Sequence, residues 1–275
     1  MGVPVALRSV AEVVGACAGD AMVVWAAQGM RCGVRAWAWG EAVAVASPEL
    51  NRRDRLTVRG PAGAVAELVR RVLPELGPSY RLLGERALVA ELVERLPGAR
   101  LLAAFEWMET GGPGEGPGAG GGSPAAAVRV GAGGGVRRGA GAADLCGGVG
   151  WLPAEADGRV AELLAVASPS AWAVPGLAGI RRWAGVRGGD GALLAVAADA
   201  WSAPQVGFVA GVATAPAFRG RGLGEAVCRF VVGELAAGHG RVALMVDSDN
   251  AGAIRVYERL GMRLRPVAAA EPPAG

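Results

Sequence analysis

The chain has 275 residues, of which 52% are hydrophobic and 19% are charged, and its net charge is +3. This length exceeds that of one minimal domain, so we expect two hydrophobic cores. All 28 basic residues are arginines, but they form no dense basic run, which argues against a nucleic-acid partner. Charged residues also interrupt every apolar run before it could span a bilayer, so we expect no membrane segment.

Targeting and metal-binding signals are not evident in the sequence. Arg8 and Glu12 stand where a signal peptide would need its apolar core, so we expect a cytoplasmic protein. The cysteines lie far apart, without the paired spacing of a zinc site or the density of a disulfide framework. We therefore expect no metal, and we interpret the four cysteines as buried free thiols: Cys17, Cys32, Cys146 and Cys228.

The first part of the chain alternates strand and helix patterns. Its apolar residues recur at strand or helix spacing in five segments: the strands Ala36–Ala46 and Arg55–Val58, the helices Ala62–Leu73 and Gly84–Leu96, and the strand Arg100–Trp107. This order predicts a small α/β domain over residues 1–109. No catalytic cluster is evident in it.

A glycine- and proline-rich segment follows. Residues 110–123 read TGGPGEGPGAGGGS, and the same bias recurs up to about residue 142. Such a composition offers little apolar surface to offset chain entropy, so we interpret residues 110–142 as a flexible linker. The linker would separate the first domain from a second one over residues 143–270.

The second domain begins with a helix pattern and continues with strands. The predicted order is helix Ala154–Val166, strands Arg181–Val186, Leu193–Asp199 and Gln205–Ala213, a helix from Leu223 to Leu235, strand Val242–Val246 and helix Asn250–Leu260. Gly238 and Gly240 end the longer helix. The sequence therefore predicts an α/β fold with a mixed sheet.

Three glycines stand at the start of the longer helix: Gly220, Gly222 and Gly224. The first amides of a helix have no partner inside it, and glycines let the backbone approach an anion closely, so this junction is suited to a pyrophosphate. A dinucleotide fingerprint would need glycine or alanine at a position that Glu225 or Val227 occupies. A Walker loop needs a lysine, which the chain does not contain.

The remaining pattern, R-x-x-G-x-G over Arg219–Gly224, resembles the acetyl-CoA motif of the GNAT superfamily. A second motif downstream, Asn250–Gly261, is similar to the closing signature N-x-x-A-x-x-x-Y-x-x-x-G of the same family. The resemblance covers Ala184–Pro266 and implies a GNAT-like second domain that binds acetyl-CoA. The first domain would be a degenerate GNAT-like half or an accessory domain, and we expect only one CoA site because the motif occurs once.

The resemblance also implies roles for individual residues. Backbone groups of Val212, Ala213 and Thr214 would pair with the pantetheine arm as an added strand does. The pyrophosphate would be held by the loop that runs through Arg219, Gly220, Arg221, Gly222, Leu223 and Gly224. Asn250 would lie near the pantetheine or cap the last helix. Tyr257 would donate a proton to the leaving thiolate or would simply be a packed aromatic residue.

The implied chemistry is aminolysis of a thioester. An alkylamine with a pKa of about 10.4 must lose a proton before it attacks, so a base is needed. The strand Gln205–Ala213 has no ionisable side chain, which leaves Asp199 and Asp247 at neighbouring strand ends as candidate bases. Both could equally be solvated strand-end residues.

We therefore expect an N-acetyltransferase that moves an acetyl group from acetyl-CoA to a primary amine without a metal. One alternative is a catalytically silent acyl-CoA-binding regulatory module, which is favoured by the lack of a base on the strand Gln205–Ala213. Another is a purely structural interaction protein, which the intact phosphate loop disfavours. The partners would be acetyl-CoA and an amine-bearing acceptor, and the protein would be a monomer or a homodimer.

Overall fold

The computed structural model describes residues 2–111 and 148–273. Most of the predicted linker and Cys146 lie outside these residues. The strands are β1 (Val5–Leu7), β2 (Arg35–Trp39), β3 (Ala42–Leu50), β4 (Arg53–Arg59), β5 (Arg81–Glu85), β6 (Arg100–Glu109), β7 (Gly150–Trp151), β8 (Ile180–Arg187), β9 (Leu193–Ala200), β10 (Gly207–Thr214), β11 (Val242–Asp247) and β12 (Arg263–Glu271). The α-helices are α1 (Val10–Ala16), α2 (Ala21–Ala27), α3 (Ala62–Val72), α4 (Arg86–Arg95), α5 (Asp157–Ala167), α6 (Leu223–His239) and α7 (Ala251–Arg259).

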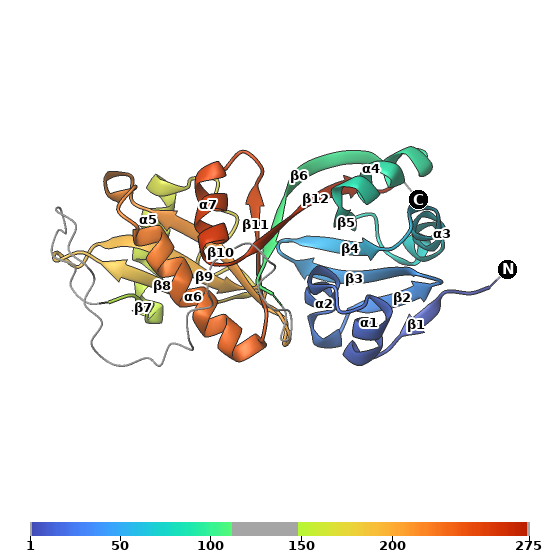
Figure 1. Cartoon of the computed structure of the whole chain (residues 1–275), viewed down its shortest axis with the longest axis horizontal. Coiled ribbons are helices and arrows are strands. Elements are labelled where there is room, and N and C mark those ends of the chain that lie inside the picture. Colours follow the sequence, from blue (N-terminus) through green and yellow to red (C-terminus); the bar gives the residue numbers. More distant parts are fainter. Residues whose placement is uncertain (1, 112–147, 274–275) are drawn as a thin grey trace, which may run out of the picture.

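The described strands form one mixed sheet in the order β1-β2-β3-β4-β5-β12-β6-β11-β10-β9-β8-β7 (Figure 1). Two neighbouring pairs are parallel, β4 with β5 and β10 with β11, and the others are antiparallel. Each parallel pair is joined through a helix, α3 or α6, as a parallel connection requires. The predicted α/β class with a mixed sheet is confirmed.

The two halves of the chain have the same topology. In each, three antiparallel strands lead into a helix, a parallel strand, a second helix and a last strand. The last strands are exchanged: β6 of the first half pairs with β11, and β12 of the second half pairs with β5. In Figure 1, β6 and β12 run side by side between the halves. The division at residue 109 stays a prediction, and the shared strands mean that neither half completes its sheet alone.

The hydrophobic core follows the alternation of side chains along the strands. On one face of the sheet, which we call the shared face, α1, α2 and α5 cover a single cluster that extends through both halves. Its centre is a trio of rings, with Trp25 stacked on Phe208 at 4.6 Å and tilted against Trp107 at 5.5 Å between centroids. The opposite face, the divided face, carries one cluster under α3 and α4 and another under α6 and α7.

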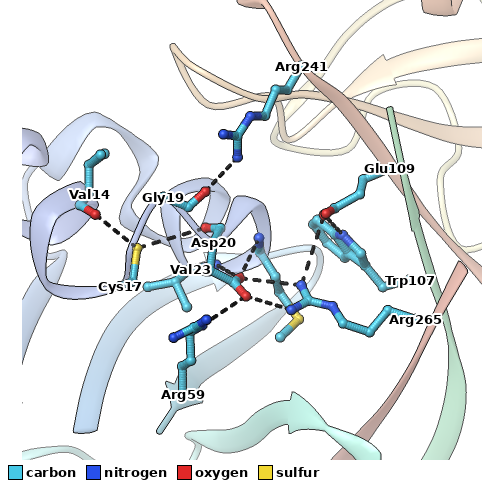
Figure 2. Close-up of polar contacts among 11 residues, drawn as sticks. Val14, Cys17, Gly19, Asp20, Val23, Arg59, Trp107, Glu109, Arg241 and Arg265 are labelled. Atoms are coloured by element: carbon cyan, nitrogen blue, oxygen red, sulfur yellow. Dashed lines mark hydrogen bonds and ion pairs between the residues drawn. The ribbon is translucent and has the colours of Figure 1, made fainter. Parts of the chain in front are cut away.

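A buried carboxylate ties the first half to the exchanged strand β12 (Figure 2). Asp20 accepts hydrogen bonds from two backbone amides in the first turn of α2, so it caps that helix. Arg265 of β12 donates to the same carboxylate at 2.5 Å, and Arg59 of β4 donates at 3.2 Å. Burial alone would raise the pKa of Asp20, but the hydrogen bond and charge of Arg265 outweigh it and lower that pKa below its usual value.

Several sequence expectations need correction. The segment Ala36–Ala46 is not one strand, because a turn with Gly40 at a φ of +57° divides it between β2 and β3. The sequence patterns predicted none of β1, α1, α2, β5 and β12. Cys17 and Cys228 are buried free thiols as expected, whereas Cys32 is exposed.

Candidate active site

A gap opens where β10 and β11 diverge. The two strands pair only from Gly207 to Val209, opposite Val242 to Leu244. One extra residue then enters β10 relative to β9 between Ala210 and Ala213, which is a β-bulge. Gly211 lies in it with a φ of +62°, and a Cβ there would approach the Trp183 ring to 2.5 Å. Glycine is therefore required at the point where β10 turns away from β11.

The edge of β10 that faces the gap is free to bind another extended chain. Ala213 and Thr214 pair with β9 on one side, but beyond Val209 no β11 residue in the described part of the chain pairs with β10. Residues 210–212 are partly exposed although β10 is an interior strand of the sheet. This arrangement gives the predicted pantetheine-binding residues Val212, Ala213 and Thr214 an open backbone edge.

The predicted phosphate loop, residues 219–224, joins this edge to α6. Gly220 and Gly222 have φ angles of +73° and +79°, and nothing lies within 4 Å of a Cβ built on either residue. Gly222 is the N-cap of α6, and no side chain caps that end of the helix. Among the described residues, no acceptor is hydrogen-bonded to the amides of 220–225. The loop thus presents unpaired N–H groups at the positive end of a helix dipole.

Gly224 and Leu223 form the first turn of α6. A Cβ on Gly224 would lie 2.9 Å from the Thr214 hydroxyl oxygen, so glycine keeps the helix start close to the end of β10. This proximity places the amides of the loop directly beyond the open edge of β10. A ligand with an extended arm and a pyrophosphate could occupy both at once.

The two arginines of the motif differ in their contacts. Arg219 donates to the backbone oxygens of Thr214 at 3.3 Å and Ala167 at 2.7 Å, so its side chain joins β10 to the end of α5. Arg221 is exposed and lies over the Phe218 ring at 5.0 Å. Arg221 is therefore the one whose guanidinium has no hydrogen-bond partner among the described residues.

Helix α7 carries the second motif. Asn250 is its N-cap and accepts a hydrogen bond from the Ala253 amide at 3.1 Å. Tyr257 is 5% exposed and lies in the divided-face cluster under α6 and α7. Burial, with a further contribution from Cys228, raises the pKa of Tyr257 well above its usual range. The phenol is therefore protonated at neutral pH.

The two aspartates predicted as bases are in contrasting surroundings. Asp199 is 2% exposed, accepts from the Ser202 hydroxyl at 2.6 Å and pairs with Arg182 at 3.4 Å. Ser202 in turn accepts from the Phe208 amide, so Asp199 holds the turn before β10 in place. Asp247 is an exposed residue at the end of β11, in the part of that strand that does not pair with β10.

A third carboxylate, Glu106 of β6, was missed by the sequence analysis. It lies opposite Val246 of β11 and is 7% exposed. Its Oε1 accepts from Arg86 and from the Ser248 hydroxyl, both at 2.7 Å, while its buried Oε2 has no partner among the described residues. No local signal marked it, because β6 belongs to the first half and reaches β11 only through the strand exchange.

The first half also contributes to the shared-face side of the gap. Asn51, after β3, is 6% exposed, and its side-chain nitrogen lies 3.8 Å from the sulfur of Met245 on β11. The Trp172 indole donates to the Asn51 carbonyl oxygen at 2.9 Å, and Arg52 donates back to Trp172 at 3.1 Å. The β3–β4 hairpin is thereby fastened against the segment that precedes β8.

Two other kinds of functional feature are absent from the described residues. No helix in them is long and apolar enough to cross a membrane. They contain no group of three or more His, Cys, Asp or Glu side chains that could hold a metal ion.

Comparisons with known proteins agree with this geometry. The model of the family described as "Acetyltransferase (GNAT) family" matches residues 147–262. None of the curated proteins matches the chain. The solved structure of a GCN5-related N-acetyltransferase from Kribbella flavida is similar over 90% of this chain and 93% of its own, with 19% identity and a TM-score of 0.54.

A protein from Novosphingobium aromaticivorans assigned to the GNAT family shares 23% identity, over 80% of this chain and 88% of its own, with a TM-score of 0.47. The likeness to the Kribbella flavida structure extends through both halves and shows that the fold as a whole is GNAT-like. The motifs, the diverging strands and the family match all fall in the second half. Residues 147–262 are therefore a domain of the GNAT family of acetyltransferases.

Proposed function

We propose that this protein transfers an acetyl group from acetyl-CoA to a primary amine by direct aminolysis. The observation that carries the proposal is the continuity between the open edge of β10 and the unpaired amides at the start of α6. A pyrophosphate fits the amides and an extended pantetheine arm fits the edge. Bound acetyl-CoA would supply the activated acyl group, and the chain would position it.

In this proposal the residues divide the work between binding and proton transfer. The loop from Gly220 to Gly224 and the exposed Arg221 neutralise the pyrophosphate, while Arg219 keeps the loop attached to α5. Tyr257 holds the proton that the leaving thiolate takes up. A backbone amide of β10 near Val212 stabilises the oxyanion.

The proton that leaves the amine needs a base, and three carboxylates qualify as candidates. Asp199 already accepts a hydrogen bond and pairs with Arg182, which favours a structural role. Asp247 is exposed at the end of β11, beyond the residues that pair with β10. Glu106 lies beside that part of β11 and has a buried oxygen without a partner among the described residues, so it would act on the amine through a water molecule.

The alternative of a catalytically silent acyl-CoA-binding module shares every binding feature. It is favoured by the lack of an ionisable side chain on β10 and by the bonded state of Asp199. A cytoplasmic location, a single CoA site, and a monomeric or homodimeric state also remain proposals. The same holds for the division into residues 1–109, 110–142 and 143–270.

Calorimetry with acetyl-CoA tests the binding site. The variant would carry Gly222→Val and Gly224→Val, because valine at Gly222 is strained at positive φ and valine at Gly224 would meet Thr214. We expect at least a ten-fold loss of affinity, about 1.4 kcal/mol. Gly233→Ala is the matched control, since Gly233 lies further along α6 with nothing within 4 Å of its Cβ.

Absence of acetyl-CoA binding by the unaltered chain would refute both the enzyme and the silent module. Where binding is found, release of CoA thiol is measured with a panel of primary amines. Release with at least one amine supports the transferase. Binding without release with any amine supports the silent module.

A further inference from the structure

One arginine of the first half is buried without a counter-charge from any described residue. Arg55, in β4, is 8% exposed. Its Nε is buried without a hydrogen-bond partner, and no ion pair or hydrogen bond joins its guanidinium to another described residue. A buried charge is normally paired, because its transfer from water is costly. Only the Nε of Arg55 is a fully buried atom without a partner among the described residues, so its Nη atoms are the ones that a partner from outside can reach.

The neighbouring positive charges make the burial of the Arg55 guanidinium more costly. Arg55 pairs in register with Arg81 of β5 and lies two residues after Arg53, so the three side chains emerge on the same face. Burial, and then the like charges of Arg53 and Arg81, lower the pKa of Arg55 to about 10. The local field therefore favours an anion from outside the described residues.

Two of the acidic residues nearby, Asp54 and Glu271, are already engaged, whereas Glu49 lines the adjoining cavity without an ion pair among the described residues. Asp54 accepts from the Glu49 backbone amide at 2.9 Å and from the Ser79 hydroxyl at 2.5 Å. Glu271, the last residue of β12, pairs with Arg81 at 3.2 Å and also pairs with Arg100, the first residue of β6. No carboxylate in the described part of the chain forms an ion pair with Arg55.

A cavity of about 450 Å³ is lined by two of these three arginines, Arg53 and Arg81, and Arg55 lies next to them on the same face of the sheet. The cavity is lined by Glu49, Arg52, Arg53, Asp54, Ser79 and Arg81 from the first half and by Leu177 and Ala178 from the second. Arg55 follows Arg53 along the same face of β4. The cavity therefore lies between the halves, beside the charged cluster.

The same region adjoins the gap between β10 and β11. Thr57, two residues after Arg55 on the same face, has a buried hydroxyl without a partner in the described part of the chain. Asn51, from the β3–β4 hairpin, touches Met245 on β11, and its side-chain oxygen is also buried without a partner from residues 2–111 or 148–273. Arg55 and Thr57 offer donors to an anion, whereas the Asn51 oxygen offers an acceptor to an amine nearer the gap.

We propose that the acceptor of this transferase carries an oxyanion, a carboxylate or a phosphate, in addition to its amine, and that Arg55 binds that oxyanion in a subsite between the halves. The statement that the bound molecule is an acceptor amine rests on the proposed function. The anion site itself does not. Arg55 acts in binding and orientation, since the bidentate guanidinium fixes an oxyanion at a set angle.

The anion site is tested directly on the full chain, without any reaction. The Nε–H resonances of the arginines are recorded by NMR, and Arg55→Met identifies the Arg55 signal. The protein is titrated with acetate and separately with inorganic phosphate at constant ionic strength. We expect the Arg55 signal to shift and saturate with one of them, which distinguishes a carboxylate from a phosphate source. Shifts no larger than those of exposed arginines with both anions would overturn the proposal.

Thermal stability provides a second measurement, in which the Arg55 variant should be more stable than the unaltered protein. Replacing a buried unpaired cation by an apolar side chain of similar length relieves its burial, so Arg55→Met should raise the Tm of the ligand-free protein by roughly 2–4 °C. Arg265→Met, which removes the partner of Asp20, is the control and should lower it. A fall in Tm for Arg55→Met would mean that Arg55 is a structural residue.

Substrate preference completes the test with matched pairs of amines. Each amino acid is compared with its amide, and phosphoethanolamine with ethanolamine, by the rate of CoA thiol release. We expect kcat/KM to be at least ten-fold higher for the anionic member of one pair, and Arg55→Met to abolish that preference while acetyl-CoA affinity is unchanged. Arg70→Met, at an exposed helix position, serves as the control.

The outcomes separate this inference from the proposed function. If no amine is acetylated, the proposed transferase fails, and the titration of Arg55 still decides the anion site. If neutral amines are used as well as anionic ones and Arg55→Met changes nothing, the anion subsite is refuted while the transferase stands.

Discussion

The Asp20 network should control both the stability of the fold and its acid sensitivity. The Asp20 side chain is 5% exposed, and Arg265 donates to it from the exchanged strand β12 (Figure 2). Asp20→Asn keeps a helix-capping side chain on α2, so the variant isolates the loss of charge. Breaking one side of a buried pair costs about 3–5 kcal/mol, and the partial exposure of Arg265 points to about 3 kcal/mol. For a chain of this size the Tm should fall by roughly 6–12 °C.

The pH dependence follows from the direction of the pKa shift. The pKa of Asp20 is lower in the folded protein than its usual value of 3.8. The stabilisation is therefore complete above the unfolded-state pKa and disappears as pH falls through the folded-state pKa. The difference between the unaltered protein and Asp20→Asn should be constant from about pH 5.5 to 8 and should shrink below about pH 4.

Urea denaturation at pH 7, 5.5 and 3.5 measures this difference. Glu91→Gln is the control, since it removes an exposed pair within α4 and should change stability by at most about 0.5 kcal/mol at any of these pH values. A loss below about 1 kcal/mol at pH 7 for Asp20→Asn would refute the view that this contact holds the exchanged strand in place. An equally large loss at pH 3.5 would refute the linkage to the Asp20 charge.

Three further outcomes can be checked. Tyr257→Phe should lower kcat about 100-fold with little change in Tm if the phenol is the acid, and an unchanged kcat would make it a packing residue. Gly211→Ala, whose Cβ would meet the Trp183 ring at 2.5 Å, should lower acetyl-CoA affinity at least ten-fold by deforming the bulge. Calorimetry measures this affinity, and an unchanged value would contradict the role of the bulge in binding. In the native state a thiol reagent should modify Cys32 at least ten times faster than Cys228, whose pKa burial raises to about 12; equal rates measured by mass spectrometry would contradict the burial pattern.

Local sequence patterns predicted most of the second half correctly. The helices α6 and α7 and the strands β8 to β11 lie where apolar periodicity and glycine punctuation placed them. Gly220 and Gly222 adopt positive φ angles, which glycine takes without a steric penalty. These features are set by neighbours within a few residues, so sequence alone contains them.

The patterns failed where local signals are weak. The helices α1 and α2 have seven residues each, and every residue of α2 is buried, so no polar face reveals a helical period. The strand β12 begins with the alternating charges of Arg263 and Arg265 and contains Pro266, so its pattern argues against an interior strand. Its place between β5 and β6 depends on partners more than 150 residues away in the chain.

The sequence by itself determined the family motifs, the phosphate loop and the second-half elements, because each depends on residue type and short spacing. The tertiary structure alone decided the exchange of β6 and β12, the bonding of Asp199 and Arg219, and the meeting of Asn51 with Met245. It also decided that Arg55 is buried without a counter-charge among the described residues. Burial and pairing of side chains depend on which distant segments pack together, and no local pattern encodes that.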